Sequence, residues 1–315
     1  MQEGKFNNFR VSEVFNHNDG RIELRKRIPL AASPVEHEDL ARRQSQEYEA
    51  LMLVNTFCPE IVPEVYGYQA KDISAENQKY RYIAMELLDT DTNVEPAEII
   101  DMIEQLQDKV PVPDSEQSTL PFYDPDTYAD KLHQMMGYLR DQGLRKGMTD
   151  YEISKISKRT AASSSAIGTF STVFVHTDVQ KRHVGKSQPD SEGNRTTKIF
   201  DFDQAHFGVE LEDFAFTSVR HPEMADIVKQ HLSAKFKDQP DKLRNLDEAM
   251  NFFTDYFLVK GMYDRVHQSR EKLFDTAARW YGRLALNSTL FRNAAERTGR
   301  ALKGIRFKTA DQPSI

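Results

Sequence analysis

The sequence contains a single cysteine, Cys58, among 315 residues. A lone cysteine cannot form an internal disulfide or a cysteine-ligated metal centre, so we expect a reducing, cytoplasmic environment. A basic excess is also lacking: 42 lysines and arginines are outnumbered by 49 aspartates and glutamates, which gives a formal net charge of −7. General nucleic-acid binders normally carry a basic excess, so this balance predicts no nucleic-acid partner.

Long hydrophobic runs are absent as well. No segment approaches the roughly 18 apolar residues that span a bilayer, and the first residues lack the apolar segment of a signal peptide. We therefore expect no membrane partner. Composition is otherwise that of a globular protein, with 39% hydrophobic and 29% charged residues. A chain of this length can bury a sizeable core in one large domain or in two lobes.

The most informative stretch covers residues 174–208. Two short β-prone runs each end in an acidic cluster, His176-Thr177-Asp178 after the first and Asp201-Phe202-Asp203 after the second. Between them, residues 188–194 have the composition of a hairpin turn. A single hairpin would bring Asp178 and Asp201 to the same rim. Two carboxylates at strand ends suit phosphoryl transfer, in which one orients the attacking hydroxyl and the other holds a metal ion.

This stretch resembles the aminoglycoside phosphotransferase and choline kinase family of protein-kinase-like enzymes. The family motif usually reads His-Gly-Asp-x-x-x-x-Asn, whereas here Thr177 replaces the glycine and His183 replaces the asparagine. The resemblance extends over roughly residues 20 to 215, and Asp213-Phe214-Ala215 continues it. It implies an α+β, bilobal fold with a small β-rich N-lobe over residues 1–88. A larger, mostly helical C-lobe over residues 89–315 would contain the catalytic hairpin.

A strand is predicted over residues 21–28, where apolar side chains alternate with polar ones. Alternation places Lys26 on the same face as Leu24, and the resemblance implies that this lysine contacts the nucleotide phosphates. Arg25 is the alternative, but it would share its face with Glu23, a poor floor for adenine. No G-x-G-x-x-G precedes Lys26, which counts against a protein kinase.

A helix is predicted over residues 35–57, ended by prolines. The resemblance selects Glu47 on this helix as the partner of the strand lysine, with Glu49 as the alternative. Two further strands are expected, over residues 62–68 and 80–88, joined by a polar turn over residues 69–79. By resemblance, the extended backbone from Glu86 to Leu88 would hydrogen-bond an adenine edge.

Beyond residue 95 the pattern becomes helical. Asp126 is a plausible N-cap for one of these helices. Asn18-Asp19-Gly20 is a hairpin turn signal near the N-terminus, and the lone Trp280 belongs with a C-terminal helical core. The predicted helices cover residues 96–109, 127–142, 222–236, 241–259 and 269–294.

Each acidic motif residue has an expected role. Asp178 is the candidate catalytic base, because a carboxylate within hydrogen-bond reach can orient a hydroxyl and accept its proton. His176 would brace the loop through backbone hydrogen bonds. Asp201 is the candidate metal ligand, since Mg²⁺ prefers carboxylate oxygens. Asp203 would face the same side if the strand stays extended, and could assist Asp201.

His183 departs from the family pattern, because an imidazole nitrogen is a softer donor than an amide oxygen and suits Zn²⁺ or Mn²⁺ better than Mg²⁺. Three interpretations stay open. His183 binds metal, Gln180 supplies the missing amide oxygen, or the site has lost efficient turnover.

Two functions follow from the resemblance. The first is an ATP-dependent kinase that uses Mg²⁺, or Mn²⁺ as the alternative, and phosphorylates a hydroxyl of a small metabolite, which could be cationic given the acidic chain. The second is a kinase-like pseudoenzyme that binds a nucleotide or a protein partner without efficient transfer. A protein kinase is disfavoured, because Thr177 stands where that class has arginine and no Ala-Pro-Glu follows Asp201. The oligomeric state is left open.

Overall fold

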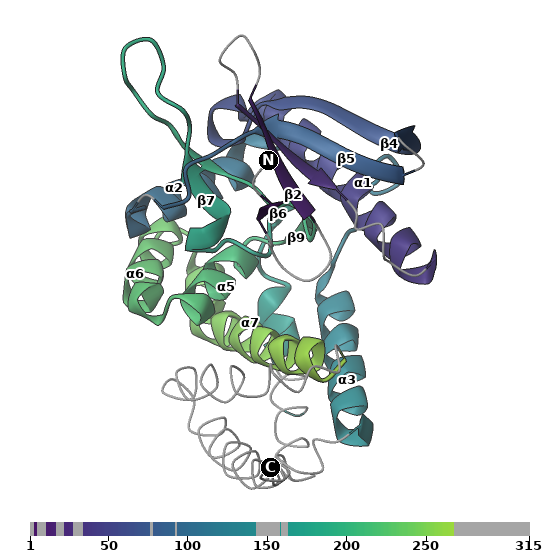
Figure 1. Cartoon of the computed structure of the whole chain (residues 1–315). Coiled ribbons are helices and arrows are strands. Elements are labelled where there is room, and N and C mark those ends of the chain that lie inside the picture. The colour runs from purple at the N-terminus through teal and green to yellow at the C-terminus, as the bar shows by residue number, and fades with distance from the viewer. Residues whose placement is uncertain are drawn as a thin grey trace, which may run out of the picture. The chain divides into compact units, whose positions relative to one another are not determined.

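The computed structural model describes residues 3–4, 11–16, 22–27, 34–75, 78–91, 93–142, 158 and 163–267. The chain divides into two compact units (Figure 1). One comprises residues 1–123 and 171–217, and the other comprises residues 124–170 and 218–315. Both sequence motifs with candidate site residues fall in the first unit. The boundary between lobes at residue 88 stays a prediction.

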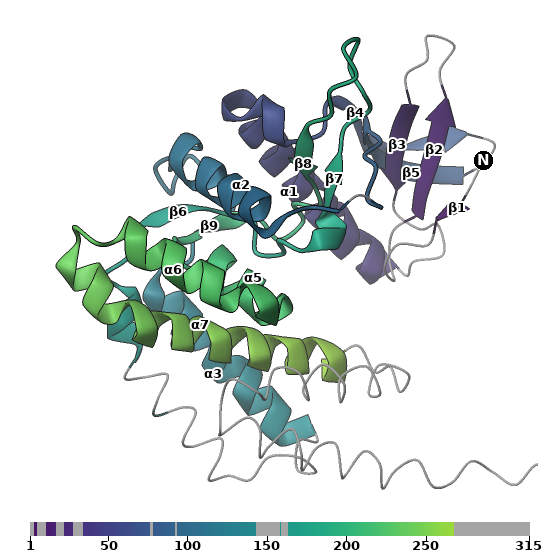
Figure 2. The same ribbon diagram turned by 90° about the vertical axis from the view of Figure 1, so that its left-hand side faces the viewer.

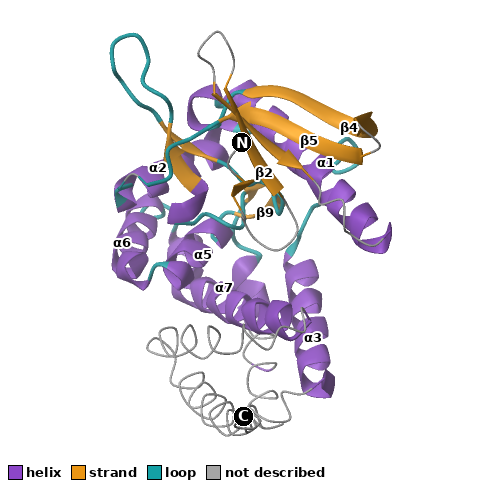
Figure 3. Ribbon diagram, viewed as in Figure 1, coloured by secondary structure: helices purple, strands orange, loops and turns teal. Residues whose placement is uncertain are grey.

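An antiparallel sheet of five strands forms the N-terminal part of the first unit (Figure 3). Its order is β1-β2-β3-β5-β4, and Lys26 of β3 lies opposite Ile83 of β5. The strand predicted at residues 21–28 is thereby confirmed. The strands are β1 (Glu3–Gly4), β2 (Val11–Asn16), β3 (Ile22–Arg27), β4 (Val65–Ala75) and β5 (Gln78–Glu86).

The polar turn expected over residues 69–79 is wrong. β4 continues through most of this stretch to Ala75, with an irregular register between Gln69 and Ile73, and β5 begins at Gln78. Among the described strands β4 lies at the edge of the sheet, and its backbone pairing with β5 continues through this polar stretch. The polar residues of this stretch therefore belong mostly to the strands and do not indicate a long turn.

Helix α1 (Pro34–Phe57) packs against β4 and β5. Tyr48 stacks on Tyr68 of β4, with ring centroids 4.2 Å apart, and Leu51 and Val54 are fully buried. These apolar contacts hold the helix along the sheet. The helix predicted over residues 35–57 is confirmed, and a short 3-10 helix η1 (Pro59–Ile61) follows it.

Two nested hairpins replace the single hairpin expected over residues 174–208. The outer pair joins β6 (Thr172–Val175) to β9 (His206–Val209). The inner pair joins β7 (Val184–Lys186) to β8 (Thr197–Ile199), and its connecting loop projects away from both strands (Figure 2). The turn signal belongs to this inner loop, where Gly193 has a φ of 85° that favours glycine.

Helix α2 (Pro96–Lys109), confirmed at its predicted bounds, is tied to the inner hairpin. Glu98 accepts a hydrogen bond from Thr197 Oγ1 at 2.6 Å and lies 3.3 Å from Lys186 Nζ. These contacts lower the pKa of the Glu98 carboxyl, the hydrogen bond from Thr197 most of all. A further helix, α5 (Glu212–Arg220), follows β9 and was not predicted.

The second unit is helical. Its packing is aromatic: the Tyr128 ring meets Phe253 and Tyr256 edge-on, at 5.1 and 5.6 Å between centroids. The helix expected at residues 241–259 continues to His267. The Asn18-Asp19-Gly20 turn, the helix at 269–294 and Trp280 lie outside the described residues. Its described helices include α3 (Pro125–Gln142), η4 (Pro222–Met224), α6 (Ala225–Lys235) and α7 (Pro240–His267).

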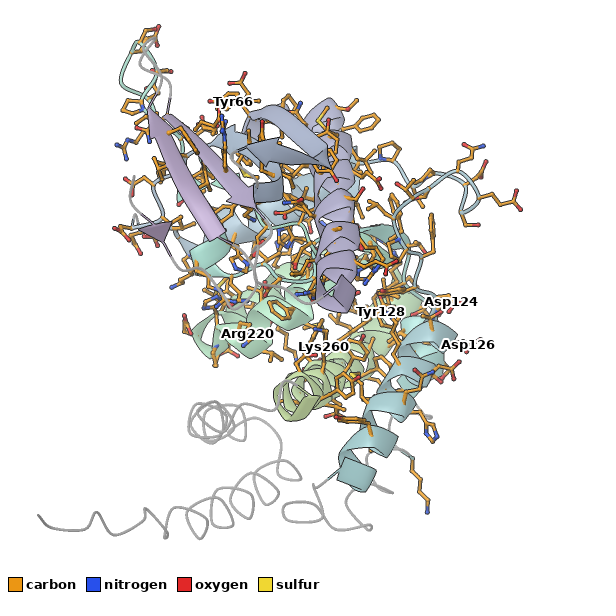
Figure 4. The ribbon with its side chains drawn as sticks, turned by 45° about the vertical axis from the view of Figure 1, so that its right-hand side comes forward. Tyr66, Asp124, Asp126, Tyr128, Arg220 and Lys260 are labelled. Carbon is orange, nitrogen blue, oxygen red and sulfur yellow. The ribbon has the colours of Figure 1, made fainter. Side chains whose placement is uncertain are left out.

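The expected N-cap of α3 is corrected from Asp126 to Asp124. The Asp124 carboxylate accepts hydrogen bonds from the Thr127 backbone N–H at 2.7 Å and from Thr127 Oγ1 at 2.5 Å. Figure 4 labels both aspartates at this end of the helix. Because Pro125 occupies the first helical position, the cap falls one residue before the proline.

None of the helices within the described ranges is both long enough and apolar enough to cross a bilayer.

Gly185 allows β7 to approach the backbone after β5. A Cβ at this position would lie 2.9 Å from Leu88 Cβ and 3.0 Å from the Asp89 carbonyl oxygen. Asp89 and Lys186 also exchange backbone hydrogen bonds at 2.9 Å, so the two segments cannot separate without breaking these bonds. We expect Gly185→Ala to lower the free energy of unfolding by roughly 1–3 kcal/mol, measured by urea denaturation.

Gly67→Ala is the matched control, since a Cβ there meets nothing within 4 Å. Equal stability of the Gly185→Ala protein and the wild type would contradict the close approach.

Candidate active site

Strand β3 carries the central cation of the site. Lys26 is buried, and its Nζ lies 2.6 Å from Glu47 Oε1 and 2.7 Å from Asp201 Oδ1. The Gln44 side chain of α1 also donates a hydrogen bond to the Lys26 carbonyl oxygen at 2.9 Å. Lys26 therefore connects the sheet, α1 and the segment after β8.

Arg25, the alternative to Lys26, and Glu49, the alternative to Glu47, have other partners. Arg25 contacts Glu23 at 2.5 Å on the opposite face and lies over the Phe15 ring, 4.0 Å from its centroid. Glu49 accepts a hydrogen bond from Ser45 at 3.3 Å. Of these residues, it is Lys26 and Glu47 that form the buried pair.

The loop after β6 is held by a buried carboxylate that the sequence motifs did not assign to it. Asp213 of α5 accepts the backbone N–H of His176 at 2.9 Å and that of Thr177 at 2.7 Å, one on each oxygen. Thr177 has a φ of 70°, in the left-handed region that costs a β-branched residue energy and that the family glycine adopts freely. Asp213 thus fixes a strained turn immediately before Asp178.

A second buried pair supports the same turn. The Thr177 hydroxyl lies 3.0 Å from His206 Nδ1, and His206 Nε2 lies 2.9 Å from Glu212 Oε2. The Tyr123 ring packs on the imidazole at 4.1 Å between centroids. Burial raises the pKa of the Tyr123 hydroxyl, and the neighbouring Glu212 raises it further. No sequence signal marked His206 or Glu212, because neither falls in a recognised motif.

His176 has the bracing geometry predicted for it. Its Nε2 lies 3.1 Å from the Phe200 carbonyl oxygen, and its Nδ1 accepts the Asp178 backbone N–H at 3.3 Å. One ring nitrogen therefore donates while the other accepts, which requires a neutral imidazole. Burial is the main cause that lowers the pKa of His176 to about 4. The ring ties the loop after β6 to the segment after β8.

Asp178, His183 and Asp201 come together as a possible metal-binding group. Each offers one ligand atom, and these atoms lie within 4.8 Å of one another. His183 ends the short helix η3 (Lys181–His183), between the outer and inner hairpins. Asp201 has a φ of 73°, so the chain turns sharply after β8. The nested hairpins thus bring the two carboxylates together, as the single hairpin was expected to do.

Asp203 and Gln180 do not lie as expected. The extended strand that would have carried Asp203 ends at Ile199, and Asp203 is not in the group of three ligand residues. The left-handed turn at Asp201 breaks the alternation on which that expectation depended. Gln180 directs its amide nitrogen at Asp178 Oδ1, so this amide donates to the carboxylate.

The segment after β5 lies beside the inner hairpin. The Glu86 carboxylate forms an ion pair with Lys198 Nζ at 2.7 Å, and Leu88 is buried. The Glu86 carboxylate is therefore occupied by Lys198 and by the Glu64 backbone N–H. Adenine binding by residues 86–88 stays a prediction.

Asp213 gives the site a measurable pH dependence. Burial raises the pKa of its carboxyl to about 7, although the backbone hydrogen bonds oppose the rise. Because an unfolded aspartate has a pKa near ~3.9, the Asp213 contribution to stability is fully present below about pH 4 and is lost as pH rises through about 7. We expect Asp213→Asn to destabilise the protein by roughly 1–3 kcal/mol at pH 5, and by less at pH 8.

Urea denaturation of both proteins between pH 5 and pH 8 checks this. His176 titrates in both, so the difference between them isolates Asp213. A difference that grows with pH would contradict the raised pKa.

Similarity to known proteins is found in structure alone. No family model and no curated protein sequence matches the chain. Among solved structures, a variant of aminoglycoside 2'-phosphotransferase-IIIa bound to GDP matches with a TM-score of 0.61 at 11% identity, covering 93% of each chain. A thermostable mutant of aminoglycoside phosphotransferase APH(4)-Ia, in ternary complex with AMP-PNP and hygromycin B, matches with a TM-score of 0.56 at 13% identity. The match covers 98% of this chain and 94% of that one.

A macrolide 2'-phosphotransferase type I matches with a TM-score of 0.52 at 14% identity, over 94% of this chain and 90% of that one. These similarities show the fold: α+β and protein-kinase-like, with a small β-rich N-terminal region and a mostly helical C-terminal region. The fold expected from the sequence is therefore confirmed.

Proposed function

We propose that this protein is an ATP-dependent phosphotransferase that transfers a phosphoryl group to a hydroxyl of a small metabolite. One observation carries the proposal. Lys26 binds Glu47 and Asp201 together, and the ligand atom of Asp178 lies within 4.8 Å of that of Asp201. A buried lysine, a metal-binding carboxylate and a second carboxylate are the parts that phosphoryl transfer requires.

Each residue has a distinct role in this proposal. Lys26, oriented by Glu47, neutralises nucleotide phosphate charge, and the backbone of residues 86–88 binds the adenine edge. Asp201 holds a divalent cation, Mg²⁺ or Mn²⁺, which would neutralise the charge on the transferred phosphoryl group. Asp178 orients the acceptor hydroxyl and accepts its proton, while His176 and Asp213 hold the loop that carries it.

The acceptor is proposed to be small and, given the net charge of −7, cationic. A structural neighbour bound to hygromycin B gives this acceptor class some precedent, at 13% identity. We further propose a cytoplasmic protein with an N-lobe over residues 1–88 and a C-lobe over residues 89–315, and with neither nucleic acid nor membrane as partner.

One observation favours the alternative, a pseudoenzyme. His183 occupies the position of the family asparagine and contacts both Asp178 and Asp201, at 3.4 and 3.3 Å. Under this alternative the protein binds a nucleotide or a protein partner, but efficient transfer does not occur.

The test measures ATP binding by calorimetry and phosphoryl transfer from labelled ATP, with Mg²⁺ or Mn²⁺, to a panel of amino sugars and amino alcohols. We expect metal-dependent ATP binding and transfer by the wild type, and loss of both in Asp201→Asn. Asp108→Asn, which changes an exposed aspartate on α2, is the matched control. Absence of ATP binding with either metal would sink the phosphotransferase and leave only a pseudoenzyme that binds a protein partner, whereas ATP binding without transfer to any acceptor would favour the nucleotide-binding pseudoenzyme.

A further inference from the structure

The orientation of the His183 ring is fixed by the backbone. His183 is buried, with a side chain 6% exposed, and its Nδ1 lies 2.8 Å from the Asp178 carbonyl oxygen. A carbonyl oxygen only accepts, so Nδ1 carries the proton and donates it. In a neutral imidazole with this tautomer, the other nitrogen, Nε2, presents a lone pair.

That lone pair faces a carboxylate. Nε2 lies 3.3 Å from Asp201 Oδ2, while the other oxygen of Asp201 is bound by Lys26 at 2.7 Å. Two acceptors at this separation repel each other unless a proton or a cation lies between them. The side chains are thus arranged so that Nε2 and Oδ2 can share a cation.

The surroundings match those of a metal-binding histidine. Such a ligand usually donates its second N–H to a carbonyl or carboxylate oxygen, as Nδ1 does here to Asp178. Arg182 Nε donates to Nε2 at 3.1 Å, but the Arg182 side chain is 52% exposed and can turn into solvent. The Asp178 carboxylate lies close to both groups, with an oxygen within 4.8 Å of each.

We propose that His183 Nε2 and Asp201 Oδ2 bind a divalent transition-metal ion such as Mn²⁺ in preference to Mg²⁺, and bind it before any nucleotide. The donor set carries the preference, because imidazole suits transition metals whereas Mg²⁺ favours an all-oxygen set that keeps several waters. The inference rests on the proposed function for the use of this cation in phosphoryl transfer.

The experiment uses the full chain freed of metal with EDTA and then given MnCl₂ or MgCl₂ without nucleotide. Electron paramagnetic resonance follows free Mn²⁺, and electron spin echo modulation reports whether a nitrogen is bound to it. We expect Mn²⁺ to bind at least tenfold more tightly than Mg²⁺, with nitrogen modulation, and His183→Asn to weaken Mn²⁺ binding by roughly 10–100-fold and abolish the modulation.

His133→Asn is the matched control, because it removes an exposed imidazole on α3 and should change neither quantity. If His183→Asn does not fold, the wild-type spectrum alone tests the inference. Either an absence of Mn²⁺ binding or bound Mn²⁺ without nitrogen modulation overturns it. Transfer that proceeds equally with Mg²⁺ in wild type and His183→Asn overturns it while the proposed function stands. Nitrogen-coupled Mn²⁺ binding without transfer to any acceptor supports it and counts against the proposed function.

Discussion

Replacing Asp178 by asparagine is expected to lower the rate of phosphoryl transfer by roughly 10²- to 10⁴-fold, the usual contribution of a positioned general base. Asparagine keeps the shape of the side chain but cannot accept the proton of the acceptor hydroxyl. The loop itself should persist, since its backbone is held by Asp213 and by the His176 ring rather than by the Asp178 carboxylate.

Single-turnover transfer measured beside ATP affinity separates the two effects. We expect the ATP dissociation constant of Asp178→Asn to stay within about threefold of the wild type, because Lys26 and Asp201 remain in place. The control is again Asp108→Asn. A variant that retains wild-type transfer would remove Asp178 from the mechanism, and another base would have to be sought.

Lys26→Met is expected to cost about 3–5 kcal/mol of unfolding free energy, the range for breaking a buried ion pair by removing one partner. The Glu47 side chain is 0% exposed and would lose the ammonium group that neutralises it at 2.6 Å. Methionine fills similar space, so a cavity does not explain the loss. Urea denaturation at pH 7.5 measures the effect.

Arg25→Met provides the comparison within the same strand. The Arg25 side chain is 23% exposed and pairs with one carboxylate, that of the buried Glu23, whereas Lys26 is buried and pairs with two, so the loss of Arg25 should cost less than the loss of Lys26. Equal costs for the two substitutions would show that burial of the Lys26–Glu47 pair contributes nothing particular to stability.

Strand alternation made the N-terminal part of the site predictable. It placed Lys26 and Arg25 on opposite faces, and the Lys26–Glu47 and Arg25–Glu23 contacts agree with that placement. The approach of Asp178 to Asp201 was also foreseen, because both follow strands joined by a recognisable turn. Their roles in catalysis stay predictions.

Backbone conformation explains what the sequence could not predict. A positive φ at Asp201 leaves no mark in a one-letter string, so the expected alternation was carried wrongly onto Asp203. The family resemblance included Asp213 without giving it a role. The structure shows that its carboxylate accepts the backbone N–H groups of His176 and Thr177. The capping role of Asp124 was missed because proline at the first helical position moves the cap one residue earlier.

The nesting of the two hairpins has a consequence for the order in which the chain assembles. β7 and β8 are joined by a short loop, so their pairing closes little chain and costs less entropy than the pairing of β6 with β9. Asp178 and Asp201 lie between the two ladders, and each is fixed only when both have formed. We therefore expect the inner ladder to form first, and the two carboxylates to be fixed beside each other only once the outer ladder has paired.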